Sequence, residues 1–253
     1  MSILLVLIKK ELKTTFNSPL IYILTGLFSL IIGWAFFNLL LTYVESLQNL
    51  PENLVGTMNF VQQVIFRLFG NINFMLIFLC PLITMRLISE EKKQHSLEFL
   101  LTAPITNTQI ILAKYFSALL MVTFVLSSSF IFPIIINTTG IHAGAYLLSG
   151  FLGIFLTAAS FTAIGLLASS VTENQIVAAL LSIVMILFLW MISWASQSTS
   201  NFYLVDLYRY LGFIDHFESF VRGLLKTTDF LYFFTVIFLS LLTSIKVLAS
   251  RNW

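Results

Sequence analysis

The sequence predicts an all-α membrane protein with six transmembrane helices. Of its 253 residues, 58% are hydrophobic and only 9% are charged, and the mean hydropathy is +0.97. Soluble domains carry about 25% charged residues, so the main solvent of this chain is lipid. Apolar segments of about 20 residues, each long enough to span a bilayer, recur between short polar stretches. No polar stretch is long enough for a separate soluble domain, so we expect one membrane domain over residues 1–253.

The N-terminal segment predicts an amphipathic helix at the membrane surface. Its apolar side chains recur at helical spacing, whereas its lysines fall elsewhere on the helical wheel. Such a helix is suited to lie on an anionic inner membrane surface. We expect no cleavable signal peptide, because the lysines follow the first apolar run instead of preceding it. The apolar residues are Leu5, Ile8, Leu12 and Phe16, and the lysines are Lys9, Lys10 and Lys13.

The six spans are expected at about residues 19–43, 68–88, 115–137, 144–169, 175–195 and 229–248. The first begins at Ser18-Pro19, because a hydroxyl cap followed by proline is typical of a helix N-terminus. Polar residues between 45 and 67 predict an outer loop before the second span.

Local patterns also mark the third and fourth spans. Thr106 and Gln109 have the spacing of a capping box, which predicts the start of the helix that continues as the third span. In the fourth span, Ser149, Gly153 and Thr157 are spaced by four. Their small side chains predict a face that another helix can approach closely.

The distribution of lysine and arginine predicts that both termini are cytoplasmic. Nine of these residues fall on the side of the termini and four on the other, and positive residues favour the cytoplasm. An even number of spans independently brings both termini to one side. The nine are Lys9, Lys10, Lys13, Arg86, Lys92, Lys93, Lys114, Lys246 and Arg251; the four are Arg67, Arg209, Arg222 and Lys226.

The inner segment from Arg86 to Pro104 is the strongest candidate site. It gathers charges in a chain that has few, next to an apolar stretch at residues 97–101 and a helix breaker at Pro104. This composition fits a cytoplasmic knob that docks in a groove of a soluble partner, and it fits a solvated hairpin equally well.

The outer segment between the fifth and sixth spans predicts a second amphipathic helix. Asp215 and Glu218 are spaced as a capping box, and Glu218 and Arg222 as an i,i+4 ion pair. The helix can serve as an external gate or as a lid that covers the bundle. Its apolar positions at helical spacing are Phe217, Phe220, Val221, Leu224 and Leu225.

The sequence offers no catalytic or metal-binding motif. It lacks the phosphate-binding G-x-x-x-x-G-K-[ST] loop, and its histidines at 95, 142 and 216 lack the paired spacing of a zinc site, so we expect each to be solvated. The net charge of +2 gives no basic field for nucleic acid. The apolar runs contain essentially no charge, which disfavours an ion-coupled carrier and an intramembrane hydrolase and favours energy supplied from elsewhere.

Several segments resemble a known family. MRLISEEKK at 85–93 and SLEFLLTAPI at 96–105 resemble the inner loop of ABC-2 type transporter permeases. SSVTENQIVAA at 169–179 is similar to that family's turn between the fourth and fifth spans. IDHFESFVRG at 214–223 and VLASRNW at 247–253 resemble the subgroup that contains the gliding-motility-associated permease. The matches follow in order along nearly the whole chain.

The resemblance implies an N-terminal interface helix, a cytoplasmic coupling helix in the first inner loop and an outer re-entrant helix. It implies a bacterial inner (plasma) membrane protein in which two permeases, identical or different, pair with two ATPase subunits. ATP and Mg would bind the ATPase, with no cofactor in this chain. ATPase coupling would fall on Glu90, Glu91, Lys92, Lys93, Ser96, Glu98 and Pro104, and the outer gate on Asp215, Phe217, Glu218, Phe220 and Arg222.

The leading hypothesis is therefore the permease of an ABC-2 exporter, which is not itself an enzyme and whose contacts are the ATPase, a second permease and membrane lipid. A self-contained secondary carrier or an intramembrane enzyme is the alternative from another class. A third possibility is an ABC complex that transmits force and moves no solute.

Overall fold

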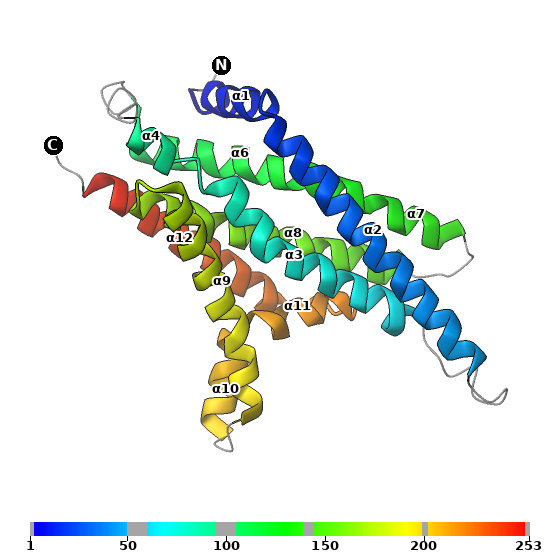
Figure 1. Ribbon diagram of the computed structural model, residues 1–253. Coiled ribbons are helices and arrows are strands. Elements are labelled where there is room, and N and C mark those ends of the chain that lie inside the picture. The colour runs from blue at the N-terminus through cyan, green and yellow to red at the C-terminus, as the bar shows by residue number, and fades with distance from the viewer. Residues whose placement is uncertain (1–2, 50–59, 95–104, 139–143, 199–201, 251–253) are drawn as a thin grey trace.

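The structure is a computed structural model that describes residues 3–49, 60–94, 105–138, 144–198 and 202–250 (Figure 1). The described residues are 90% helical and contain no strand, which confirms the all-α prediction. Six helical segments are long and apolar enough to cross a membrane, as predicted. They are Pro19–Gln48, Val61–Lys93, Asn107–Ile136, Gly144–Val171, Gln175–Trp194 and Thr227–Ala249.

The helices build one bundle in which several elements are short. Along the chain they are α1 (Ile3–Phe16), α2 (Pro19–Gln48), a π-helical turn (Val61–Ile65), α3 (Phe66–Thr84), α4 (Ser89–Lys93), α6 (Asn107–Ser127), a 3-10 turn (Ser128–Phe130), α7 (Ile131–Thr138), α8 (Gly144–Val171), α9 (Gln175–Ser198), α10 (Phe202–Leu211), α11 (Phe213–Val221) and α12 (Thr227–Ala249).

Two predicted helix starts are confirmed by their hydrogen bonds. The Leu20 amide donates to Ser18 Oγ over 3.4 Å at the start of α2. At the start of α6, the Gln109 amide donates to Thr106 Oγ1 over 3.3 Å, and the Thr106 amide donates to Gln109 Oε1 over 3.1 Å. This is the reciprocal capping box that the spacing of Thr106 and Gln109 predicts.

The helices are longer than the apolar runs that predicted them. α2 continues to Gln48, and residues 60–67, which we expected in an outer loop, are helical. The expected boundaries lie where polar side chains begin. Backbone hydrogen bonding does not require apolar side chains, so a helix continues past the point where it leaves the hydrocarbon region.

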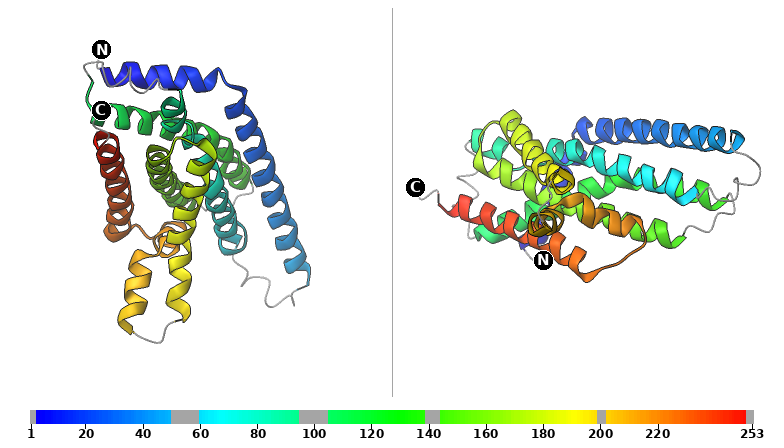
Figure 2. Two further views of the ribbon diagram at one scale, coloured as in Figure 1. Left: turned by 60° about the vertical axis from the view of Figure 1, so that its left-hand side comes forward. Right: turned by 90° about the horizontal axis from the view of Figure 1, so that it is seen from below.

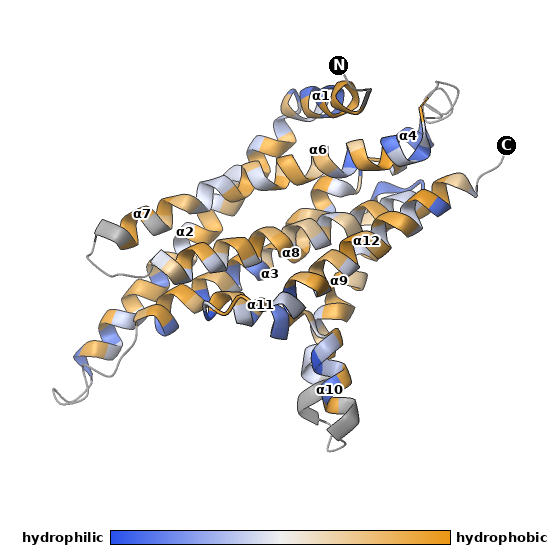
Figure 3. Cartoon of the chain, turned by 180° about the vertical axis from the view of Figure 1, so that it is seen from behind, coloured by the Kyte–Doolittle hydropathy of each residue, from blue (hydrophilic) through white to orange (hydrophobic). Residues whose placement is uncertain are grey.

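Both described ends of the chain lie on one side of the bundle, which we call the terminal face. Figures 1 and 2 show α1, α4 and the end of α12 on this side, whereas α10 and the end of α2 extend on the opposite face. α1 runs across the end of the bundle instead of along it, as expected for an interface helix (Figure 2). Figure 3 shows that hydrophilic residues concentrate toward the ends of the spans.

α8 is the most buried of the six spans, and its glycines allow neighbouring helices to pack closely. A Cβ atom at Gly150 would lie 2.3 Å from the ring of Phe69 in α3. At Gly153 it would lie 2.7 Å from Cβ of Phe220 in α11. Ser149 and Thr157 on the predicted small face are also buried, so the expected close approach is confirmed.

Replacing Gly153 by alanine should destabilise the bundle by about 1–3 kcal/mol. The Cβ of Phe220 cannot rotate away, so α11 would have to move. Cys80, the single cysteine, is fully buried, and its labelling by a thiol-reactive dye during heating reports unfolding. Gly26→Ala is the matched control because a Cβ there would meet nothing within 4 Å. Equal labelling temperatures for the two variants would contradict this prediction.

The outer segment differs from its prediction in two respects. α11 begins at Phe213 with Gly212 as its N-cap and no side-chain cap, so the predicted capping box at Asp215 is wrong: Asp215 lies inside the first turn. α11 ends at Val221 because Gly223 has φ = +79°, and the amide of Leu224 donates to the Ser219 carbonyl over 2.9 Å. Leu224 and Leu225 therefore lie beyond the helix and are exposed.

Candidate coupling and gate sites

A buried lysine joins three elements at the terminal face. The Nζ atom of Lys114, the eighth residue of α6, lies 3.2 Å from Glu11 Oε1 of α1 and 2.8 Å from Glu91 Oε2 of α4. It also donates to the Leu87 carbonyl over 2.6 Å. The Lys114 side chain is only 3% exposed and the two carboxylates are 18% and 19% exposed. One cation thus pairs with groups from α1 and from the loop between α3 and α6, which contains α4 and which we call the first loop.

The end of α8 forms the second attachment of this loop. Ser169 Oγ accepts the amides of Ile88 and Ser89, each over 3.1 Å, and donates to the Met85 carbonyl over 3.1 Å. The buried Lys92 ammonium donates to the Ser170 carbonyl. A lysine at this position satisfies a carbonyl that has no partner inside the last turn of a helix and complements the helix dipole.

These two attachments define what we call the terminal-face junction: Glu11, Leu87, Glu91, Lys92, Lys114 and Ser169. It connects α1, the loop between α3 and α6, and the end of the most buried span. α4 is therefore held to α6 by an ion pair and to the end of α8 by hydrogen bonds.

The predicted coupling residues fall into three groups. Glu91 and Lys92 belong to the junction, so their first partners are in this chain. Glu90 is half-buried and accepts from Gln94 Nε2 over 3.4 Å, and Lys93 is exposed beside the turn between α8 and α9. Ser96, Glu98 and Pro104 lie outside the described residues.

On the opposite face, His216 of α11 and Asp229 of α12 form a buried pair. Their Nδ1 and Oδ1 atoms are 2.7 Å apart, and the side chains are 8% and 4% exposed. Nε2 of His216 lies 3.0 Å from the Tyr210 carbonyl oxygen, and its ring stacks on Tyr232 at 4.2 Å. The expectation of a solvated His216 is therefore wrong: α11 folds back into the bundle and covers it. His95 and His142 lie outside the described residues.

The partners of His216 determine how many protons the pair holds. A carbonyl oxygen can only accept, so Nε2 carries a hydrogen. The short contact between Nδ1 and Oδ1 requires one more proton between the two atoms. Whether this proton is assigned to the ring or to the carboxyl group, the pair is neutral overall. A neutral pair is the form that a buried, low-dielectric position favours.

The predicted gate residues lie on two sides of α11. Phe217 and Phe220 are buried against the bundle, as their helical spacing predicts. Asp215, Glu218 and Arg222 are exposed, and the predicted ion pair is confirmed with Arg222 Nη2 2.8 Å from Glu218 Oε2. Ile214 donates its amide to Ser193 Oγ of α9 over 3.3 Å. α11 is therefore held by α8, α9 and α12, and its role as a gate stays a prediction.

Lys114, Glu11, His216 and Asp229 are the residues that sequence reasoning missed. We expected essentially no charge in the apolar runs, but Lys114 and Asp229 are buried near the ends of spans. Lys114 is the only charged residue of α6, and Asp229 lies in the first turn of α12, whose one other charged residue is Lys246 in the last turn. An isolated charge in such a position is the signal that could have singled them out.

The fold thus defines a class: a multi-pass helical membrane protein with charged attachments at the ends of its spans. Within the described ranges, no three histidine, cysteine or acidic side chains gather where they could hold a metal ion. The family model described as "ABC-2 family transporter protein" matches residues 5–250, so the chain belongs to the ABC-2 transporter family. No curated protein matches it. Membership makes the chain a membrane transport component, a permease rather than an enzyme, and implies association with an ABC ATPase.

Proposed function

We propose that this chain is the permease of an ABC-2 exporter and that a separate ATPase drives it from the terminal face. The terminal-face junction is the observation that carries the proposal. The loop that resembles the family's coupling loop is fastened to α6 by Glu91 and to α8 by Lys92. A force applied to α4 would therefore reach both spans.

The same proposal makes the terminal face cytoplasmic in a bacterial inner membrane. The lysine and arginine bias supports this orientation. The resemblance of residues 214–223 and 247–253 supports placing the chain in the subgroup that contains the gliding-motility-associated permease. Two permeases, identical or different, would enclose the path, with ATP and Mg bound by the ATPase. The exposed apolar side chains of α2, α9 and α12 are available for lipid and for a second permease.

The ATPase would dock on the exposed edge of the first loop and on the neighbouring turn between α8 and α9. Lys93 shares a cavity of about 390 Å³ with Glu173, Asn174 and Gln175 of this turn. Charged and polar groups that face water without serving the internal junction are suited to recognise a partner. Glu98 joins them by the resemblance alone.

The test purifies the tagged full-length chain from its native membrane and measures ATPase activity and the recovery of a subunit with a phosphate-binding loop. We expect Lys93→Ala with Glu98→Ala to lower recovery by about tenfold while Cys80 stays protected from labelling. Lys246→Ala removes an exposed charge of the same face and should change neither. Undiminished recovery and coupled hydrolysis in the Lys93/Glu98 variant would refute the docking surface. Absence of any ATPase from the unsubstituted chain would refute the proposed function.

A further inference from the structure

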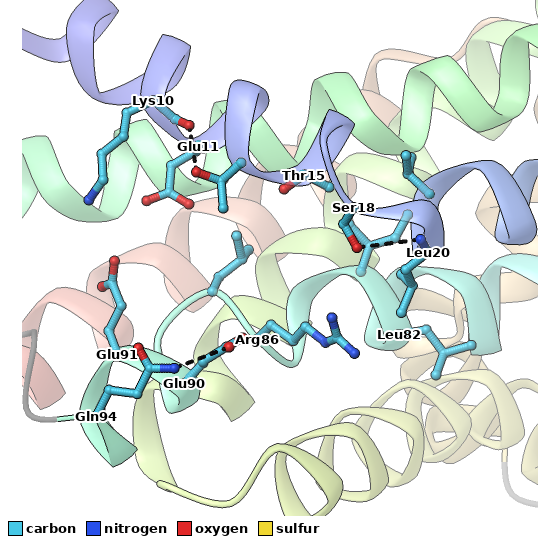
Figure 4. A pocket seen from close by; sticks show the side chains of 14 residues that line it. Lys10, Glu11, Thr15, Ser18, Leu20, Leu82, Arg86, Glu90, Glu91 and Gln94 are labelled. Atoms are coloured by element: carbon cyan, nitrogen blue, oxygen red, sulfur yellow. Dashed lines mark hydrogen bonds between the residues drawn. The ribbon is translucent and has the colours of Figure 1, made fainter.

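A cavity of about 340 Å³ lies at the terminal face where α1 meets the ends of α2, α3 and α4 (Figure 4). This size is within the range of small-molecule sites. Its walls change character from one end to the other. Near α2 and the end of α3 they are apolar, then hydroxyl groups and a guanidinium follow, and the end at α4 is acidic.

The apolar end opens toward the spans. Leu20 and Leu82 line it, together with the buried Ile21 and Ile83. Leu82 is 37% exposed, so this end of the cavity is continuous with surface that hydrocarbon covers in a membrane. A ligand held here can therefore extend apolar chains along the spans.

The middle of the cavity is suited to an anion. Figure 4 shows the Arg86 guanidinium in the middle of the cavity, on the wall opposite Ser18 and Thr15. Within the described ranges no acidic side chain forms an ion pair with Arg86. Ser18 Oγ accepts the Leu20 amide, which leaves its hydroxyl hydrogen for a ligand. A guanidinium and hydroxyl donors are groups that bind phosphate.

The end at α4 is suited to a cation with N–H donors. Glu11, Glu90 and Glu91 line it with Lys10 and with the Gln94 amide. Glu11 and Glu91 share the Lys114 ammonium, and Lys10 is the lysine in the cavity lining, so a formal count of three carboxylates against two ammonium groups leaves this end at −1. Arg86 gives the middle +1. No aromatic side chain lines the cavity, so it lacks the cage that recognises quaternary ammonium groups.

We propose that this cavity binds the headgroup of an aminophospholipid, with a phosphate at Arg86, Ser18 and Thr15 and a primary ammonium at Glu90. The order of chemistry along the cavity, apolar, anion-binding and then cation-binding, is the order of acyl chains, phosphate and amine in phosphatidylethanolamine. The charges of such a zwitterion match the two polar regions one to one. A bound headgroup joins α1 to α3 and α4 beside the terminal-face junction.

The test uses the full-length chain in nanodiscs that contain equal parts of phosphatidylethanolamine, phosphatidylcholine and phosphatidylglycerol, with native mass spectrometry to identify retained lipid. We expect phosphatidylethanolamine to be retained about tenfold over the other two. Arg86→Ala and Glu90→Gln should each abolish this preference, and Lys246→Ala should leave it intact. Cys80 labelling verifies that all variants are folded.

Each other outcome overturns a defined part of the proposal. Equal retention of the three lipids, or a preference that survives Arg86→Ala and Glu90→Gln, refutes the site. Retention of phosphatidylglycerol as strong as that of phosphatidylethanolamine refutes the ammonium subsite. Soluble phosphoethanolamine is added in a second arm: if it displaces the lipid at micromolar concentration, the natural ligand is a soluble phosphoamine and the lipid assignment is wrong. The readout does not involve an ATPase, so it is independent of the proposed function.

Discussion

Replacing Lys114 by methionine is expected to destabilise the bundle by about 3–5 kcal/mol, the usual cost of removing one partner of a buried ion pair. Methionine keeps the unbranched apolar stem of the side chain, without the terminal ammonium, but leaves Glu11 and Glu91 facing each other and the Leu87 carbonyl without its donor. The temperature at which Cys80 becomes labelled should fall by several degrees. ATPase stimulation in the assembled complex should also fall, because α4 loses its connection to α6.

A rescue experiment separates charge from packing. Glu11→Gln with Glu91→Gln in the Lys114→Met background removes the uncompensated charges, and a buried pair can be replaced by neutral groups at little cost. Most of the lost stability should return, whereas coupling to the ATPase should not. If the triple variant is as unstable as Lys114→Met, the carboxylates are not the source of the loss. A double-mutant cycle between Lys114 and Glu91 then measures their coupling directly.

Helix number and local helix starts could be predicted from the sequence because they depend on residues close together in the chain. The capping box at Thr106 joins residues three apart, and the ion pair of Glu218 and Arg222 joins residues four apart. The small face around Gly153 could be predicted as a packing face, because small side chains spaced by four allow another helix to approach closely. What comes close, Phe220 of α11, depends on the fold.

The sites could be predicted only in part, because their contacts join residues far apart in sequence. Lys114 meets Glu11 across 103 positions, and Lys92 meets the Ser170 carbonyl across 78. Charge content marked residues 86–104 as important. It could not show that Glu91 and Lys92 turn inward while Lys93 stays exposed. That distinction depends on where the ends of α6 and α8 lie.

On both faces of the bundle, a buried polar contact attaches a short helix to a membrane span. On the terminal face Lys114 fastens a short helix to the spans, and on the opposite face the pair of His216 and Asp229 does so. α8 connects the two regions: Ser169 at its end holds the first loop, and Gly153 lies against α11. A buried polar group has few alternative partners, so these contacts hold each short helix in one position. The helix can leave that position only if the contact breaks.

Replacing His216 by phenylalanine is expected to cost about 3–5 kcal/mol, because the ring still stacks on Tyr232 but Asp229 is left as an unpaired buried carboxylate. Asp229→Asn should cost only about 1 kcal/mol, because its amide can donate to Nδ1 while Nε2 still donates to the Tyr210 carbonyl. Cys80 labelling on heating measures the stability of both variants. In a separate experiment, a cysteine cross-link between α11 and α12 in a Cys80→Ala background reports whether α11 detaches. If Asp229→Asn is as damaging as His216→Phe, a negative charge rather than the hydrogen-bonded proton holds α11. If neither variant has an effect, the pair does not fasten α11 to the bundle.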